Sequence, residues 1–419
     1  MILGLKIWLG AVVLVTLMYT IRHLLFAFVR LYYPQRHSYQ DIAGVYLPTV
    51  CIMVPMHNEE LVVSQTIRAL KKIDYPKDLL KIIIIDDRST DRTGAILDEL
   101  CASSPHITVL HRTDRDGSEG GKPAALNHAL RFTDAEVILT FDADYWPSRD
   151  SVMRLVAPLV DPKVVLTMGR VVPRNPDANF LTRMLDLERA GGYQVNQQTR
   201  HTLNLLPQYG GTVGAIRRSF IMTLNGWDAS YLAEDTYLTV QAFIHGLSVT
   251  YVNLEETTEE VPTTWSVRQK QLRRWVIGHN QVAFRLGAKM LRSPFLSIWQ
   301  KIDGIFMMFL YGSTMLLATG YVAAIILLLL GDGLFAGASM AVILFTTYST
   351  LGNSAAFIEI AVSAILDSRP RAVLSVPGMI FHFAGSLYVV IYATLDWLWL
   401  ELRGKRQVQW QKTARTGGE

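Results

Sequence analysis

Four long apolar runs constrain the fold of this chain more than any other feature of its sequence. One lies near the N-terminus and three fill most of the last third of the chain, at residues 3–29, 302–330, 334–366 and 373–400. Each run exceeds the roughly 20 residues that a helix needs to cross a bilayer. The first run lacks a small-residue cleavage site and is longer than a signal-peptide core, which predicts a retained membrane helix over residues 1–31.

Charge and cysteine usage indicate on which side of a membrane the polar middle of the chain lies. Four basic residues follow or end the first run, namely Arg22, Arg30, Arg36 and His37. By the positive-inside tendency they favour a cytoplasmic location for the middle of the chain. The two cysteines, Cys51 and Cys101, lie in unrelated contexts, which fits a reducing compartment. The net charge of +4 is modest, and no nucleic-acid partner is expected.

Between residues 48 and 280 the pattern changes to short apolar strands that alternate with amphipathic helices, which is typical of an open α/β sheet. Strands are predicted at residues 50–55, 82–85, 137–140 and 164–172. Ligands of such sheets bind beyond the carboxyl ends of the strands. The polar segments that follow the first two strands, at residues 57–60 and 86–93, are therefore expected to meet in one crevice.

Two aspartates follow the predicted strand at residues 137–140. Asp142 and Asp144 are two positions apart, so in an extended backbone both side chains point to the same face. Two adjacent carboxylates attract a cation, and a hard ion such as Mg²⁺ or Mn²⁺ binds one or two carboxylates and completes its shell with water and substrate phosphates. The pattern indicates a metal-bridged diphosphate, and the alternative is a solvated acidic turn.

Two further segments carry groups suited to a nucleotide. Asp86 and Asp87 leave an isoleucine-rich strand and need water or donors such as a nucleobase or ribose, whereas residues 89–91 also suit the cap of the next helix. Lys122 follows two glycines and precedes a proline at an expected helix start, where backbone N–H groups favour a diphosphate. The alternative for Lys122 is an ordinary glycine-rich loop that leads into a helix.

Three later segments have both a structural and a functional interpretation. Glu234 and Asp235 open a predicted helix, where acids stabilise the helix dipole, but a carboxylate with aromatic neighbours is also suited to act as a general base for a sugar hydroxyl. The basic helix start at residues 268–277 suits anionic lipid headgroups, while its Trp275 offers a flat face to a pyranose ring. The amide-rich stretch at residues 194–198 is either the wall of a polar groove or solvated surface.

Six motifs occur in the order found in the membrane-embedded family 2 glycosyltransferases that make cellulose, chitin, hyaluronan and poly-N-acetylglucosamine. They are Val54-Pro-Met-His-Asn-Glu-Glu60, Asp86-Asp-Arg-Ser89, Gly121-Lys-Pro-Ala-Ala-Leu-Asn127, Asp142-Ala-Asp144, Glu234-Asp235 and Gln271-Leu-Arg-Arg-Trp275. The chain resembles these processive synthases over residues 49–278, with apolar runs on both sides as in that family. The resemblance implies a GT-A (Rossmann-like) α/β domain with a mixed, mostly parallel sheet, joined to an α-helical transmembrane region.

The resemblance also implies which residues bind the donor. Asp87 would contact the uracil of a UDP-sugar, and Lys122 would lie near the diphosphate. The residues that would border the nucleoside are Pro55, Asn58 and Glu59. Asp142 would contact the nucleotide-sugar, and Asp144, with Asp142 beside it, would ligate Mg²⁺ or Mn²⁺.

For the acceptor side, the resemblance implies a base and a binding platform. Asp235 of the Glu234-Asp235 pair would deprotonate the acceptor hydroxyl. Gln271, Arg274 and Trp275 form the Gln-x-x-Arg-Trp signature, in which Arg274 would face the leaving diphosphate and Trp275 would stack on the acceptor sugar. The reaction is then a single inverting displacement without an enzyme nucleophile.

Two segments differ from, or extend, the pattern of the synthases. Residues 210–218 lack the Phe-Cys-Gly of cellulose synthases and are closer to the versions in aminosugar polymerases, although Arg217 and Arg218 equally suit surface charges. Residues 410–417 resemble the gating segment of hyaluronan and chitin synthases. That resemblance implies that three residues near the end of the chain close over bound substrate, namely Trp410, Thr413 and Arg415.

The topology of the C-terminal part is left open by the sequence. One N-terminal and three C-terminal spans place the C-terminus outside, whereas the basic residues at 403–406 favour the inside, so one run is expected to be interfacial or broken. Trp299 and its neighbours suggest an interfacial helix. Glu359, inside an apolar run, either faces a channel or lies near an interface.

The expected organisation is a membrane helix, a cytoplasmic GT-A domain, an interfacial helix, C-terminal membrane helices and a cytoplasmic tail, at residues 1–31, 48–280, 281–300, 301–400 and 401–419. The expected function is transfer of sugar from a UDP-sugar, with UDP-GlcNAc or UDP-Glc favoured, to a growing β-linked polysaccharide at a bacterial-type plasma membrane. The alternatives are transfer of one sugar to a lipid acceptor and a catalytically silent transporter or assembly subunit. Membrane lipid is an expected partner, and a small membrane partner subunit remains open.

Overall fold

The computed structural model describes residues 1–37, 39–113, 121–350 and 356–403. A seven-stranded sheet forms the centre of its α/β domain, in the order β3-β2-β1-β4-β6-β5-β7. The strands are β1 (Val50–Met56), β2 (Leu80–Asp87), β3 (Ile107–Arg112), β4 (Val137–Thr140), β5 (Val164–Pro173), β6 (Gly214–Arg217) and β7 (Ser248–Glu259). Strand β6 is antiparallel to β4 and β5, and the other neighbours are parallel. The predicted mixed, mostly parallel sheet is confirmed.

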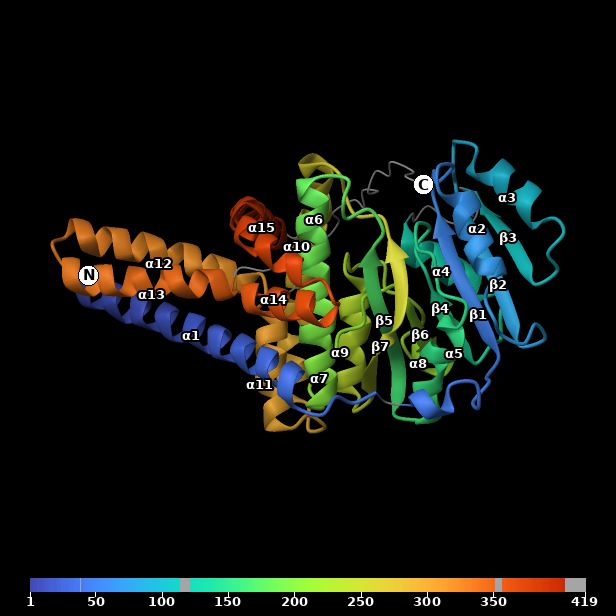
Figure 1. Cartoon of the computed structure of the whole chain (residues 1–419), viewed down its shortest axis with the longest axis horizontal. Coiled ribbons are helices and arrows are strands. Elements are labelled where there is room, and N and C mark those ends of the chain that lie inside the picture. The colour runs from blue at the N-terminus through green and yellow to red at the C-terminus, as the bar shows by residue number, and fades with distance from the viewer. Residues whose placement is uncertain (38, 114–120, 351–355, 404–419) are drawn as a thin grey trace.

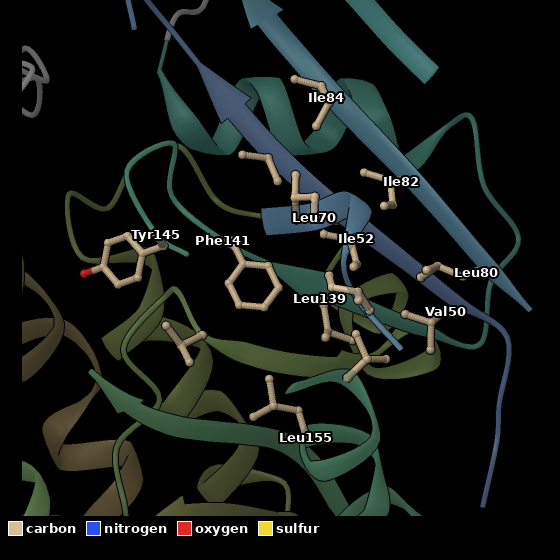
Figure 2. Packing of buried hydrophobic residues seen from close by; sticks show 14 of the residues in the cluster. Val50, Ile52, Leu70, Leu80, Ile82, Ile84, Leu139, Phe141, Tyr145 and Leu155 are labelled. Carbon is tan, nitrogen blue, oxygen red and sulfur yellow. The ribbon is translucent and has the colours of Figure 1, made fainter. Parts of the chain in front are cut away.

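The central strands are apolar on both faces because helices cover both sides of the sheet. In β2, Ile82 and Ile84 pack with helices α2 (Val63–Lys71) and α3 (Thr93–Cys101). Ile83 and Ile85 pack with α4 (Lys122–Leu130) and α9 (Glu234–Ile244) on the opposite face. Figure 2 shows the first of these layers, in which Leu70 of α2 meets Ile52, Ile82 and Leu139 of neighbouring strands. This explains why the run of isoleucines lacks a polar alternation.

The other regular elements of the described chain are helices. In the α/β domain they are α2 (Val63–Lys71), α3 (Thr93–Cys101), α4 (Lys122–Leu130), α5 (Ser151–Val156), α6 (Phe180–Ala190), α7 (Gln198–Thr202), α8 (Arg218–Thr223) and α9 (Glu234–Ile244). The long or apolar helices are α1 (Ile2–Tyr32), α10 (Trp265–Arg292), α11 (Ile298–Met308), α12 (Gly312–Leu329), α13 (Gly333–Thr350), α14 (Phe357–Leu366) and α15 (Met379–Leu402). Shorter elements are the 3-10 helices η1 (Gln40–Ile42), η3 (Ala157–Val160) and η5 (Pro370–Gly378), and the π-helix η4 (Gly191–Gln197).

The order of the strands decides where a ligand meets the sheet. The chain proceeds outward from β1 to β2 and β3, and it then returns to place β4 on the other side of β1. The carboxyl ends of β1 and β4 therefore open into the crevice where parallel sheets of this kind bind ligands. The segments after β1, β2 and β4 all begin at this edge.

Three apolar helices form an arm that projects from the α/β domain (Figure 1). Helices α1, α12 and α13 pack through fully buried residues, among them Leu9, Leu317 and Ile343.

Within the described residues, three helical stretches are long and apolar enough to cross a membrane, namely Ile2–Tyr32, Gly312–Leu329 and Pro370–Leu402. The run at residues 302–330 is divided into α11 and α12, and the run at 334–366 into α13 and α14. The segment at residues 281–300 comprises the second half of α10 and the start of α11.

The amides at residues 194–198 join the arm to the domain. Arg30 of α1 donates to the carbonyl oxygen of Gln194 at 2.7 Å and to its side-chain oxygen at 2.9 Å, and the Gln194 amide in turn donates to Asp367 at 2.7 Å. Gln194 and Gln198 are buried. Gln194 and Gln198 are therefore not solvated surface, because both are buried and bind neighbouring segments. A π-helix such as η4 is rare, and here it carries Gln194 at this contact.

Buried charges meet where α1, α11 and α14 reach the domain. Asp303 lies 2.8 Å from the Arg22 guanidinium and 3.5 Å from that of Arg200. Glu359 is fully buried and lies 2.9 Å from Nδ1 of His23. Glu359 thus contacts α1 and the N-terminal backbone of its own helix. We call the cluster of Arg22, Arg200 and Asp303 the helix junction.

Candidate active site

The segments after β1 and β2 are bound to each other at the crevice. Pro55 pairs with Ile85 of β2, and three residues later Asn58 adopts a left-handed backbone with φ of 56°. The Asn58 side-chain oxygen accepts a hydrogen bond from the backbone N–H of Thr90 at 2.7 Å. The backbone N–H of the buried Glu59 donates to the hydroxyl of Thr93 at 2.7 Å. The structure therefore brings Pro55, Asn58 and Glu59 together with the end of β2.

Asp87 receives its donors from the protein. One oxygen of Asp87 accepts from Arg112 at 2.7 Å and from Arg88 at 3.1 Å, and the other accepts from the backbone N–H of Gly121 at 3.2 Å. Sequence reasoning missed Arg112, although it lies directly opposite Asp87 in the parallel pairing of β2 with β3. The neighbouring Asp86 is opposite His111 in the same way and lies 2.9 Å from its Nδ1. Adjacent strand ends thus supply the cations that the two aspartates need.

His111 and Asp91 support this edge of the crevice. Burial lowers the pKa of His111, but its hydrogen bonds with Asp98 and Asp86 outweigh burial and raise that pKa above the ordinary value. Asp91 accepts a hydrogen bond from the backbone N–H of Thr93 at 2.9 Å, at the start of α3. Asp91 therefore binds the first residue of α3 from the position before the cap, because the N-cap is Arg92, which makes no side-chain cap hydrogen bond.

The end of β4 separates apolar and acidic side chains by alternation. Phe141, Ala143 and Tyr145 belong to the core, and Figure 2 shows the Phe141 and Tyr145 rings in that layer. Asp142 and Asp144 lie between them and are not part of this hydrophobic cluster. The strand ends at Thr140 and the chain turns at residues 143–144, so the two acids do not share one strand face by spacing alone. Nζ of Lys122 donates to Asp142 at 2.6 Å, and also to the carbonyl oxygen of Gly211 at 2.8 Å.

Asp144 is nearly inaccessible and its turn is bound on both sides. A side-chain oxygen of Asp144 accepts from the backbone N–H of Glu260 at 3.4 Å, and its carbonyl oxygen accepts from Arg174 at 2.7 Å. The Arg174 guanidinium also lies 3.9 Å from the ring centroid of Trp146. These contacts from the end of β7 and from the segment after β5 fix the position of the acidic turn.

The Glu234-Asp235 pair opens α9 and faces Lys122. Oε1 of Glu234 lies 4.0 Å from Nζ of Lys122, and Asp235 accepts from the backbone N–H of Thr236 at 2.6 Å. Gly211 packs closely against Asp235, because a Cβ at Gly211 would lie 3.1 Å from the Asp235 Cβ, and Gly211 has a φ of 78°. Both facts require glycine at this position.

Burial makes these carboxylates unusually basic. Burial raises the pKa of Glu234 to about 7, and Lys122 opposes this rise while Asp235 adds to it. Burial also raises the pKa of Asp235 above its ordinary value, against hydrogen bonds from Thr236 and the charge of Lys122. A carboxylate that titrates near neutrality is well matched to general-base catalysis.

Gln271, Arg274 and Trp275 lie on helix α10. Oε1 of Gln271 accepts from Arg268 at 2.9 Å. The guanidinium groups of Arg268 and Arg189 each lie 5.0 Å from the ring centroid of Trp275. The half-buried Arg274 immediately precedes Trp275. Two other arginines of α10 bind carboxylates of α15 rather than lipid headgroups alone, since Arg273 pairs with Asp396 and Arg285 with Glu401.

A chain of polar contacts connects Trp275 to the acidic turn. Arg189 binds Glu259 at 2.7 Å, and Glu259 accepts from the hydroxyl of Tyr145 at 2.7 Å. Tyr145 immediately follows Asp144. Sequence reasoning missed Arg189 and Glu259, because they come from distant segments without a local motif. The three residues of the expected gating segment, Trp410, Thr413 and Arg415, lie outside the described residues.

The donor set suits a hard divalent ion that binds together with a phosphate ligand. Among the described residues, no group of three or more His, Cys, Asp or Glu side chains is arranged as a complete metal cage. Mg²⁺ and Mn²⁺ do not need such a cage when one or two carboxylates combine with water and substrate phosphates. Asp142 and Asp144 at the end of β4 fit that requirement.

Comparison with known proteins agrees with this arrangement. Residues 51–223 match the family described as "Glycosyl transferase family 2". The chain carries a family 2 glycosyltransferase domain. The enzyme class predicted from the motifs is therefore confirmed for this domain.

The relatives of the glycosyltransferase domain differ in their named products. "Probable glycosyltransferase YdaM" of Bacillus subtilis is 35% identical over 247 residues, covering 59% of this chain and 59% of that protein. A beta-monoglucosyldiacylglycerol synthase of Synechocystis is 32% identical over 241 residues, which cover 58% of this chain and 50% of that protein. Glucomannan 4-beta-mannosyltransferase 7 of Arabidopsis thaliana is 26% identical over 260 residues, which cover 61% of this chain and 47% of that protein. The matches thus span about half to three fifths of the length of these relatives.

A solved structure has the same fold. A mannosyltransferase from Pyrobaculum calidifontis, in complex with GDP-Man and Mn²⁺, superposes with a TM-score of 0.61 at 20% identity, covering 90% of this chain and 98% of that one. The GT-A fold expected for the glycosyltransferase domain is confirmed.

Proposed function

We propose that this protein transfers a hexose from a nucleoside diphosphate sugar to the hydroxyl of a lipid acceptor at a membrane surface, with inversion at the anomeric carbon. A UDP-sugar, UDP-Glc or UDP-GlcNAc, is the proposed donor. The observation that carries this proposal is the meeting of Lys122, Asp142, Glu234 and Asp235 at the carboxyl edge of the sheet. The relation to a monoglucosyldiacylglycerol synthase supports the lipid acceptor.

Asp235 is the proposed general base. One of its oxygens, Oδ1, accepts from the backbone N–H and the hydroxyl of Thr236, which leaves Oδ2 to receive the proton of the acceptor hydroxyl. The raised pKa of Asp235 favours this proton transfer. Glu234 beside it keeps negative charge near Lys122 while the donor is absent.

Lys122 and the acidic turn are proposed to bind the leaving group. The Lys122 ammonium lies between Asp142 and the Gly211 carbonyl, from where it can contact a diphosphate. A Mg²⁺ or Mn²⁺ ion bound to Asp142 and Asp144 would neutralise charge that develops on the departing nucleoside diphosphate. Asp87, with Pro55, Asn58 and Glu59, is proposed to border the nucleoside.

The helical region supports a lipid acceptor better than an exported polymer. Gly320 of α12 lies against α1, and a Cβ there would come within 2.7 Å of Val12. A polymer that passed between α1 and α12 would have to separate these helices. Trp275 packs near Val389 and Val390 of the apolar helix α15, so an acceptor that stacks on Trp275 would border apolar surface. We place the domain on the cytoplasmic side of a plasma membrane because basic residues follow α1.

A growing β-linked polysaccharide is the second candidate acceptor. The similarity to a glucomannan mannosyltransferase favours it, as does the resemblance of the motifs to processive synthases. On this alternative, Trp410, Thr413 and Arg415 would close over the substrate.

Product analysis separates the two candidates. Purified protein in lipid micelles would be incubated with radiolabelled UDP-Glc, UDP-GlcNAc, UDP-GlcA, UDP-Gal or GDP-Man, together with diacylglycerol or ceramide. We expect a chloroform-soluble labelled product from one UDP-sugar. A high-mass labelled product would favour the polysaccharide, and transfer to no acceptor from any donor would contradict the proposed function.

A further inference from the structure

Three ionisable side chains from three helices meet beside the proposed acceptor platform. Oε1 of Glu188 in α6 lies 3.0 Å from the Arg268 guanidinium of α10, and its Oε2 lies 2.5 Å from Nε2 of His382 in α15. All three residues are at most 2% exposed. None of them belongs to a motif of the glycosyltransferase domain, and His382 lies in a stretch long and apolar enough to cross a membrane.

The cluster is costly to build, which points to a positional role. Burial raises the pKa of Glu188, but the charges of Arg268 and His382 more than reverse this and lower it to about 2, so Glu188 stays ionised. A buried ion pair commonly stabilises a fold no better than apolar residues of the same shape. Moreover, Nε of Arg268 and Nδ1 of His382 are buried without a hydrogen-bond partner among the described residues. Stability alone therefore accounts poorly for this cluster.

The cluster contacts two residues of the Gln-x-x-Arg-Trp signature. The same Arg268 donates to Oε1 of Gln271 at 2.9 Å, and its guanidinium lies 5.0 Å from the ring centroid of Trp275. Its position therefore bears directly on the orientation of both signature side chains. Since Glu188 binds Arg268 with both oxygens, at 3.0 and 3.3 Å, it restricts how the guanidinium can turn.

His382 is fixed in turn by the N-terminal end of α10. The Trp265 ring stacks on the His382 ring at 5.6 Å between centroids with an interplanar angle of 8°. Gly385, one turn further along α15, permits this approach, because a Cβ there would lie 2.6 Å from the Trp265 ring. Helix α15 thus contacts the N-terminal turn of α10 beside the cluster.

We propose that His382 is a positioning residue, through which the last apolar helix aligns Trp275 and Gln271 by way of Glu188 and Arg268. This inference rests on the proposed function, because it assigns Trp275 and Gln271 to the acceptor side of that site. It implies that the acceptor platform reaches its working geometry only when α15 is docked. Donor binding at the strand ends does not depend on this contact.

Steady-state kinetics of two substitutions at His382 test the proposal. His382→Phe keeps a ring against Trp265 but removes the N–H that binds Glu188, whereas His382→Gln keeps an N–H donor. We expect His382→Phe to raise the acceptor KM and lower kcat, together reducing kcat/KM for the acceptor about 10- to 100-fold, with the donor KM unchanged. His382→Gln should recover part of this loss. The exposed His245→Phe is the matched control and should behave as wild type.

A purely structural role for His382 predicts a different result. Misfolding would lower the active fraction, so kcat would fall while the KM values of donor and acceptor both stayed the same. That outcome, or a wild-type acceptor KM in His382→Phe, would overturn the proposal. If His382→Phe does not fold, Glu188→Gln applies the same test from α6.

A double-mutant cycle locates the effect. If His382 acts through Trp275 and Gln271, then adding His382→Phe to a variant that carries both Trp275→Ala and Gln271→Ala should cause less than a twofold further loss, because coupled residues are not additive. Full additivity of the two losses would contradict the proposal. A different result would contradict the proposed function itself, namely that the wild-type protein transfers sugar to no acceptor.

Discussion

The crevice at the strand ends and the helix junction both bury charge, but they balance it differently. In the crevice, Lys122 lies near three carboxylates, those of Asp142, Glu234 and Asp235. In the helix junction, one carboxylate, Asp303, lies between the guanidinium groups of Arg22 and Arg200. The first region has an excess of buried negative charge, and the second has an excess of positive charge beside a hydrogen-bonded acid.

The difference separates chemical from structural use of buried charge. Burial in the crevice raises the pKa of Glu234 to about 7, and the neighbouring Asp235 adds to this rise while Lys122 opposes it. Such a group exchanges protons near neutral pH and attracts a cation. Asp303, in contrast, has two cations and also accepts from the backbone N–H of Leu206 at 3.4 Å. It therefore connects α11 to α1 and α7 without being available for chemistry.

Asp235→Asn is expected to have the largest effect on transfer. It removes the proposed base while preserving the shape of the side chain, so kcat should fall by about 10²- to 10⁴-fold. The exposed Asp134→Asn is the matched control and should leave the rate unchanged. A rate for Asp235→Asn within twofold of wild type would show that the acids of the crevice do not act as bases.

Removal of the divalent ion should have the next largest effect. We expect EDTA to reduce transfer by about 10²- to 10³-fold, with recovery on adding excess Mn²⁺ or Mg²⁺, because the ion offsets charge on the leaving diphosphate. Asp144→Asn should require more metal for half-maximal activity than wild type. Isothermal titration with Mn²⁺ in the presence of UDP measures this difference directly. Equal metal binding by wild type and Asp144→Asn would contradict the assignment of Asp144.

Lys122→Gln should shift the pH dependence. The proposed base acts only when deprotonated, and Lys122 lowers the pKa of both Glu234 and Asp235. Its removal therefore raises these pKa values, and the acidic limb of the pH profile of kcat/KM should move to higher pH by about one unit. At pH 6 this shift alone should lower kcat/KM about tenfold, in addition to any change of kcat/KM at the plateau of the pH profile. If the acidic limb of the profile moved to lower pH, the contrast between the two regions would be contradicted. The exposed Lys163→Gln is the control and should leave the profile unchanged.

Asp303→Asn should have the smallest effect on catalysis and a large effect on stability. It removes the carboxylate that binds both buried guanidinium groups, and breaking a buried ion pair typically destabilises a fold by about 3–5 kcal/mol. The more exposed pair of Lys6 with Asp332 provides the control, since Asp332→Asn should cost only about 0–1 kcal/mol. Thermal unfolding in detergent measures the difference. The KM and kcat of folded Asp303→Asn should match wild type, and altered KM values would show that the helix junction contributes to the site.

Much of the crevice was predictable because it depends on short-range rules. Parallel strand order brings the ends of β1, β2 and β4 to one edge, and with them the acidic segment that follows β4. The fold class follows from the same pattern of strands and helices. Arg112 and His111 were not predicted, because their role depends on the register of β3 beside β2. No local motif reveals this register.

The helical side was much less predictable, for a physical reason. Glu188 precedes Arg268 by 80 positions and His382 by 194 positions along the chain. Each looks unremarkable in its own segment, and the partners can be matched only when the packing of α6, α10 and α15 is known. The same holds for Glu359, whose partner His23 lies 336 positions away. Apolar periodicity locates such helices but not the pairing of their few polar groups.

The alternation at the end of β4 also sets a limit on how this protein can change. Because Phe141 and Tyr145 pack in the hydrophobic cluster while Asp142 and Asp144 do not, loss or gain of one residue in this short stretch would put acids in the places of the aromatic rings. Aromatic rings would then face the ligand and carboxylates would enter the hydrophobic interior. Related enzymes are therefore expected to vary the length of nearly every other loop around the crevice before they vary this one.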